Sequence, residues 1–318
     1  MTLELSALFG MEYSPKMVRD VHIGDGVFLQ EIKLNHKIAE LVRRVKDTDE
    51  KSYRRLVMRE ELEERPYTHR FYVSLGDESS LRGERVKEAR QNIARAIVLS
   101  RVVNPLPIPL IPTVISTVDR SEAEIDVGFY GTAFCPYKTS WDSQPSWDVR
   151  DFPETITVED ANLMASFWTA SQDIYDNRKH FKRMHRALVA FNDAFHIFPS
   201  HWKHIVLHAA LETLICTTRR NKRNQIVRRL PQLIKGINED QVEAIYEFCI
   251  DVKHDAAPGL LYSKSPRQMD PRDLERYKAA GWLEESLRKL FIKALEDKAF
   301  AEELEDKNVL EAKYPVPK

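Results

Sequence analysis

Apolar positions recur at helical spacing through the second half of the chain. A hydroxyl at Thr157 followed by Asp160 is typical of a capping box at a helix start, and Asn238 with Gln241 has the same spacing. Gly281 precedes the last periodic segment, whose apolar face consists of Leu283, Leu287, Leu290, Phe291, Ala294 and Leu295. The pattern predicts a helical bundle with helices over residues 157–175, 180–195, 199–217, 223–235, 238–254 and from 282 to 297 or beyond.

The first half has a different pattern, in which prolines and β-branched residues dominate. The segment around Pro105, Pro107, Pro109 and Pro112 excludes a helix there, because proline lacks an amide donor and clashes with the preceding turn. Strands are predicted over 68–75, 113–118 and 125–130, whereas 27–45 and 80–99 have helical character. This half is therefore predicted to be mixed α+β.

Residues 135–155 separate the two patterns. They are rich in Pro, Ser and Asp and have no periodicity, which is typical of a long connection. We therefore predict an α+β protein with a mixed N-terminal domain over residues 1–155 and an all-α bundle over 156–318, with the boundary between 135 and 157.

Composition narrows the protein class. The chain is 43% apolar and 31% charged with a net charge of −1, so a nucleic-acid site must come from a local basic patch. The sequence lacks an 18-residue apolar run and a convincing signal peptide, so no membrane association is expected. Three separated cysteines, Cys135, Cys216 and Cys249, suggest reduced thiols and a cytoplasmic location. No cofactor is expected.

Four polar residues share one face of the predicted helix over 199–217. His201, His204, His208 and Glu212 follow one another at three- or four-residue intervals, within reach of one another. Two imidazoles and a carboxylate could bind a divalent metal. The competing interpretation, which we favour, is a polar seam of the bundle that Leu211 and Ile215 flank closely. We predict no metal site.

A basic stretch follows these histidines. Residues 213–238 hold seven Lys or Arg and no acid. Such a cluster can neutralise several phosphates and would make binding depend on salt. The alternative is a solvated loop balanced by the acidic segment 302–311. The candidate nucleic-acid-binding residues are Arg219, Arg220, Lys222, Arg223, Arg228 and Arg229.

The predicted helix over 238–254 ends in a crowded polar run. Asp251 lies three residues before His254, on the same face, and Lys253 lies between them. An acid, an ammonium and an imidazole within one turn can perform general acid–base chemistry, although a solvated surface cluster has the same composition. These three residues are the candidate catalytic group.

Three segments carry a resemblance to a known family. RALVAFNDAFHIFPSHWKHIVL at 186–207, ALETLI at 210–215 and IYEFCIDVKHDAAP at 245–258 resemble the HEPN superfamily, in particular its Apea-like branch. The resemblance implies a helical bundle that dimerises, and a protein that binds or cuts RNA, as in bacterial defence or toxin systems.

The motif that this family uses for cleavage is incomplete here. Active members have an arginine followed by a polar residue, with a spacer of four to six residues between the arginine and a histidine. His254 fits the histidine, but the arginine positions hold Cys249, Phe248 and Glu247. Arg228 or Lys253 would have to substitute. Replacing Cys249 with arginine would restore some cleavage if that position lies beside His254.

The leading hypothesis is therefore an RNA-associated protein with a degenerate catalytic motif. One alternative is a diverged, metal-independent ribonuclease that uses His254. The other is a dimerising protein–protein interaction module without RNA activity. We also expect a homodimer through the helical half, with an apolar seam that includes Phe167 and Trp168.

Overall fold

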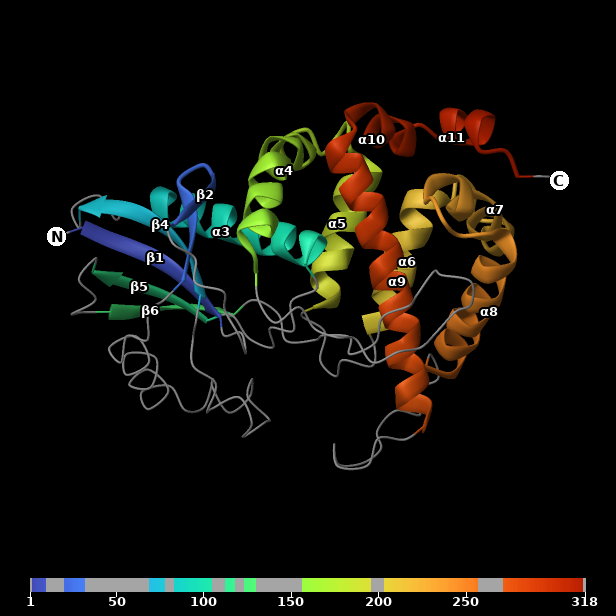
Figure 1. Ribbon diagram of the computed structural model, residues 1–318, viewed down its shortest axis with the longest axis horizontal. Coiled ribbons are helices and arrows are strands. Elements are labelled where there is room, and N and C mark those ends of the chain that lie inside the picture. Colours follow the sequence, from blue (N-terminus) through green and yellow to red (C-terminus); the bar gives the residue numbers. More distant parts are fainter. Residues whose placement is uncertain are drawn as a thin grey trace. The chain divides into compact units, whose positions relative to one another are not determined.

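The computed structural model describes residues 2–9, 20–31, 69–77, 83–104, 112–117, 123–129, 156–195, 203–256 and 271–316. The chain divides into two compact units. In the described residues, the first unit contains a sheet, one helix and the beginning of a second helix, up to Trp168. The second unit contains the rest of that helix and all the helices that follow (Figure 1).

One antiparallel sheet is the main element of the first unit in its described part. Its six strands lie in the order β2-β3-β4-β1-β5-β6, so the N-terminal strand is central. Their bounds are β1 Thr2–Phe9, β2 Val21–Gly24, β3 Val27–Glu31, β4 His69–Asp77, β5 Pro112–Thr117 and β6 Ala123–Phe129.

Alternate residues of the strands build an apolar core against helix α3 (Glu84–Val103). On β1, Leu5 and Ala7 are fully buried, and Ala7 lies opposite the fully buried Phe71 of β4. Helix α3 packs against β1, β3 and β4 and buries Ile93 and Ala96, among others. The apolar side chains at every second strand position therefore pack against the apolar face of α3 in one core.

The strand residues between these apolar positions are polar or aromatic. Arg70 forms a buried ion pair with Glu4, with 2.6 Å between Nη1 and Oε2, and it also donates to Ser6. Its guanidinium lies 4.1 Å from the ring centroid of Tyr72, which pairs across the sheet with Phe28. Burying the charge of Arg70 is tolerated because Glu4 and Ser6 satisfy its donors.

Helix α4 (Val158–Asp176) starts with the predicted capping box, which the structure confirms. The amide of Asp160 donates to Thr157 Oγ1 at 3.0 Å, and the amide of Thr157 donates to Asp160 Oδ2 at 2.9 Å. Phe167 and Trp168 further along α4 are buried, and the indole of Trp168 lies 5.1 Å from the guanidinium of Arg95 on α3. They are therefore not a free apolar surface, and the expected dimer loses this support.

The second unit is built from helices alone in its described part. Helix α6 packs against α5, α7, α8 and α9, and α7 packs beside α8 (Figure 1). The bounds are α5 Lys182–Ala194, α6 Lys203–Ile215, α7 Lys222–Leu233, α8 Glu239–Ala256, α9 Pro271–Glu296, α10 Lys298–Glu305 and α11 Lys307–Lys313.

Apolar helix faces form the core of this unit. The face predicted for the last helix, from Leu283 to Leu295, is buried on α9. Phe291 of α9 meets Phe191 of α5 edge to face, with 5.3 Å between ring centroids. The capping box of α8 is also confirmed, since Asn238 and Gln241 exchange hydrogen bonds of 3.0 and 2.9 Å.

A charged pair lies inside this apolar core. Lys203 of α6 and Glu284 of α9 are each 1% exposed and are joined by a 2.7 Å contact. The Lys203 ammonium also lies 3.7 Å from the ring centroid of Phe195. The pair fixes one point of α6 against one point of α9, because either charge alone would be strongly unfavourable there.

The predicted α+β fold with a helical C-terminal region is confirmed, with two local corrections. Residues 27–31, predicted as helix, form strand β3, and Gly281 lies inside α9 instead of preceding it. The predicted boundary between 135 and 157 falls almost wholly outside the described residues and stays a prediction. Within the described ranges, none of the helices combines the length and apolar character that crossing a membrane requires.

Candidate functional site

The basic stretch forms a loop between α6 and α7, followed by α7 itself. We call residues 216–221 the basic loop. Arg219 and Arg220 lie on this loop and are exposed. In the described part of the chain, neither side chain takes part in an ion pair. These two guanidiniums are therefore available to an anion from solution.

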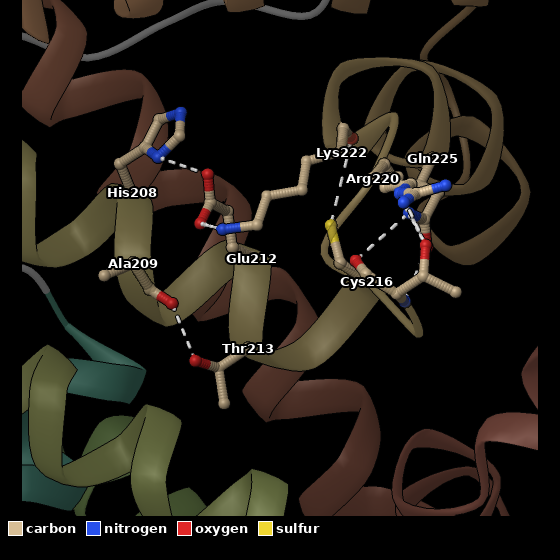
Figure 2. A network of polar contacts seen from close by, with 9 residues as sticks. His208, Ala209, Glu212, Thr213, Cys216, Arg220, Lys222 and Gln225 are labelled. Carbon is tan, nitrogen blue, oxygen red and sulfur yellow. Dashed lines mark hydrogen bonds and ion pairs between the residues drawn. The ribbon is translucent and has the colours of Figure 1, made fainter.

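The buried side chain of Gln225 holds the basic loop in one conformation. Its Oε1 accepts hydrogen bonds from the amide of Thr217 at 2.8 Å and from the amide of Thr218 at 3.5 Å. Its Nε2 donates to the carbonyl of Arg220 at 2.7 Å (Figure 2). One amide side chain thus satisfies backbone groups at both ends of the loop, and the exposed arginines stand on a braced backbone.

Arg229 was predicted to contact phosphate, but the structure places it in the interior. It is 2% exposed and donates to Gln225 Oε1 at 3.0 Å, to the carbonyl of Ile215 at 2.9 Å and to the carbonyl of Tyr314 at 3.0 Å. Burial lowers its pKa, but a guanidinium remains protonated in proteins. Arg229 therefore connects α6, the basic loop and the C-terminal segment instead of facing solvent.

A second buried arginine completes the end of α6. Arg183 of α5 donates to the carbonyls of Thr213 at 2.9 Å, Leu214 at 2.6 Å and Cys216 at 3.1 Å. Together with Arg229 it satisfies carbonyls that a helix end leaves without partners, and two cations suit the negative end of the helix dipole. Sequence reasoning missed Arg183 and Gln225, because no spacing links them to the loop.

The remaining cations of the predicted cluster lie in ion pairs at the surface. Lys222 pairs with Glu212, whose carboxylate lies between Lys222 and His208 (Figure 2). On α7, Arg223 pairs with two glutamates of α8 and Arg228 pairs with a third. Among the described residues, the six predicted cations thus divide into two without an ion pair, three paired at the surface and one buried.

The histidine face of α6 is a polar seam. His204 and His208 are buried, and His208 Nδ1 lies 3.2 Å from Glu212 Oε1. The His208 ring stacks on Tyr246, with 5.1 Å between centroids. Burial, with Glu212 nearby, raises the pKa of Tyr246. His201 lies outside the described residues, which contain no group of three or more His, Cys, Asp or Glu suited to a metal ion.

The candidate catalytic group lies at the end of α8. Asp251 is exposed, whereas Lys253 and His254 belong to α8 but their side chains are outside the described part of the chain. Their convergence therefore stays a prediction.

Position 249, however, is described. Cys249 is fully buried, its sulfur lies 3.9 Å from the carbonyl of Ala279, and burial raises the pKa of its thiol. An arginine at position 249 would therefore disrupt the core, and the suggested Cys249→Arg substitution is not a usable restoration of cleavage. Glu247, the most distant candidate position for the motif arginine, is exposed and contacts Arg223.

Comparisons with known proteins do not place the chain in a family. No family model, curated protein or solved structure matches it. The resemblance to the HEPN superfamily therefore stays a prediction that rests on the three sequence segments alone.

Proposed function

We propose that this protein binds RNA by its phosphate backbone, with Arg219 and Arg220 as the primary contacts. The observation that carries the proposal is the braced basic loop, on which both exposed guanidiniums lie outside any ion pair among the described residues. Arginine suits phosphate because its planar fork donates two parallel hydrogen bonds. A braced backbone reduces the conformational entropy lost on binding.

The salt dependence of binding gives the number of phosphates contacted. For single-stranded nucleic acid, the slope of log affinity against log salt is about −0.7 per phosphate neutralised. If only Arg219 and Arg220 bind, the expected slope is about −1.4. If all five surface cations of the cluster took part, the slope would approach about −3.5. We expect the smaller value, because Lys222, Arg223 and Arg228 are already paired.

The test uses a fluorescein-labelled single-stranded RNA and the full chain, with affinity measured by anisotropy at several salt concentrations. The double variant Arg219→Gln/Arg220→Gln is expected to lose about tenfold or more in affinity at low salt, together with most of the salt slope. The matched control is Arg178→Gln/Lys179→Gln, which removes two exposed cations elsewhere in the second unit. Equal losses in both variants, or none in the first, would refute the proposal.

The proposal is for binding without rapid cleavage. Electrostatic stabilisation of the kind that the missing arginine would supply contributes about 10²–10³ in rate. The proposal that cleavage is slow is supported by the burial of Cys249 and by the acid at Glu247, two positions where the motif arginine would stand. Brisk RNA cleavage by the wild-type protein that disappears in His254→Ala would instead favour the diverged ribonuclease.

A homodimer in the cytoplasm, acting in a bacterial defence or toxin system, completes the proposal. The family resemblance and the three separated cysteines support it. Light scattering at micromolar concentration tests the dimer, and a monomeric mass would contradict it.

A further inference from the structure

Three glutamates of α8 lie in a row along the side that contacts α7. Glu239, Glu243 and Glu247 follow one another at four-residue intervals, so they share one face of the helix. We call them the carboxylate row. Helices α7 and α8 pack side by side (Figure 1). The row therefore lies against the helix that carries the second half of the basic stretch.

The carboxylate row engages both surface arginines of α7. Arg228 pairs with Glu239, and Arg223 contacts Glu243, with 2.6 Å between Nη2 and Oε1, as well as Glu247. Contact with these carboxylates raises the pKa of Arg223. A single guanidinium facing two carboxylates leaves an excess of negative charge at this place.

We propose that the carboxylate row competes with RNA inside the protein. Its carboxylates occupy the positions beside Arg223 and Arg228 that phosphate groups would otherwise take. The inference rests on the proposed function. Carboxylate and phosphate oxygens accept from the same arginine donors. Here the carboxylates take Nη2 of Arg223 and Nη1 of Arg228, so a phosphate that binds these nitrogens must displace them. While the pairs persist, Arg219 and Arg220 set the affinity.

The exchange is possible because these pairs are exposed. The side chains of Arg223 and Glu247 are 45% and 54% exposed, and surface ion pairs contribute little to stability. RNA must nevertheless displace the carboxylates and then tolerate their charge beside its phosphates. Removing the carboxylates should consequently strengthen binding, an outcome that a purely structural role of these pairs would not produce.

The direct test is the full-length variant Glu243→Gln/Glu247→Gln, which frees Arg223 and keeps the size of both side chains. We expect RNA affinity at low salt to rise about three- to fivefold, the factor that corresponds to a surface ion pair. The salt slope should steepen by about 0.7, because one more phosphate is neutralised. Glu239 is left unchanged, because an acid in the first turn of α8 stabilises the helix.

Two further variants separate competition from a simple change of net charge. Glu296→Gln/Glu302→Gln removes two exposed acids of the second unit that, among the described residues, form no hydrogen bond or ion pair with α7. This control should change affinity much less. Adding Arg223→Gln to the Glu243→Gln/Glu247→Gln variant should abolish the gain. A gain of equal size in the control, or one that survives loss of Arg223, overturns the inference.

Binding to immobilised heparin keeps this result distinct from the failure of RNA binding itself. Later elution of Glu243→Gln/Glu247→Gln than of the wild type and of the control supports the carboxylate row as a competitor for polyanions, even if wild-type RNA binding does not depend on Arg219 and Arg220. Identical elution of all three proteins, together with unchanged RNA affinity, overturns it.

Discussion

Acidification should destabilise the first unit through one buried imidazole. His69 lies at the start of β4, between Phe9 of β1 and Glu31 of β3, and is fully buried. Burial lowers its pKa from 6.5 to about 4, because the charged form would lose its hydration. Between pH 6.5 and pH 4 the unfolded chain therefore binds a proton that the folded unit does not bind.

The sign and size of the effect follow from this difference in protonation. The contribution of neutral His69 to the free energy of unfolding is fully present above pH 6.5. It is lost as pH falls from 6.5 to 4, because the unfolded chain binds a proton that the folded unit does not bind. At about 1.4 kcal/mol per pH unit, the free energy of unfolding is about 3 kcal/mol lower at pH 4. That is a large fraction of the total stability of a typical domain.

The assay combines two measurements on the full chain. An NMR titration of ring-labelled histidine should show one imidazole that remains neutral down to about pH 4. Denaturant unfolding from pH 7.5 to 4.5 should show a weaker pH dependence in His69→Gln than in the wild type. His185→Gln serves as the control, since burial lowers the pKa of that histidine too, but in the second unit. Titration of all imidazoles near pH 6.5, or an unchanged slope in His69→Gln, would refute the reasoning.

Two further predictions concern packing. Gly24→Ala should lower the free energy of unfolding by about 1–3 kcal/mol, because the new Cβ would overlap the indole of Trp168. In Gly26→Ala the new Cβ meets no neighbouring atom, so only the strain of a left-handed backbone should destabilise the variant. Thermal unfolding of both variants measures the difference. Lys203→Met alone should lower the free energy of unfolding by about 3–5 kcal/mol, because it leaves the charge of Glu284 buried without a partner. Lys203→Met/Glu284→Leu should recover most of that loss. A double variant as unstable as the single one would contradict this prediction.

Much of the helical unit was predictable, because its information is local. Both capping boxes use residues three apart, and the apolar face of α9 repeats within one helix. The predicted start of α9 at residue 282 was wrong, because Gly281 was taken to precede the helix. A glycine inside a helix costs about 1 kcal/mol relative to alanine, and the burial of neighbours such as Trp282 and Leu283 outweighs it.

The sheet was harder to predict from local pattern. Strand β3 lies where helical character was expected. Val27 and Leu29 have the two-residue spacing of one strand face, but a segment this short does not establish a period, and the pairing with β2 and β4 decides it. Strand β1 shows alternation in its sequence, but its central place comes from partners far away in the chain.

The candidate site shows the same division between local and distant information. Arg219 and Arg220 were predictable as a basic pair, since their exposure follows from a loop composition. The different role of Arg229 was not, because its acceptors include the carbonyl of Tyr314, 85 residues away. A charge count cannot distinguish a cation that faces solvent from one that joins three segments in the interior.

The bond between Arg229 and Tyr314 also has a consequence for synthesis. A ribosome that adds about 5–20 residues per second needs on the order of ten seconds for the 85 additions that lead from Arg229 to Tyr314. During that interval the residues of α6 and α7 have already been synthesised, but one donor of the Arg229 guanidinium still lacks its carbonyl partner. The nascent helical unit therefore completes its interior only when the segment around Tyr314 has emerged, and newly made chains would be most open to proteases and chaperones before that point.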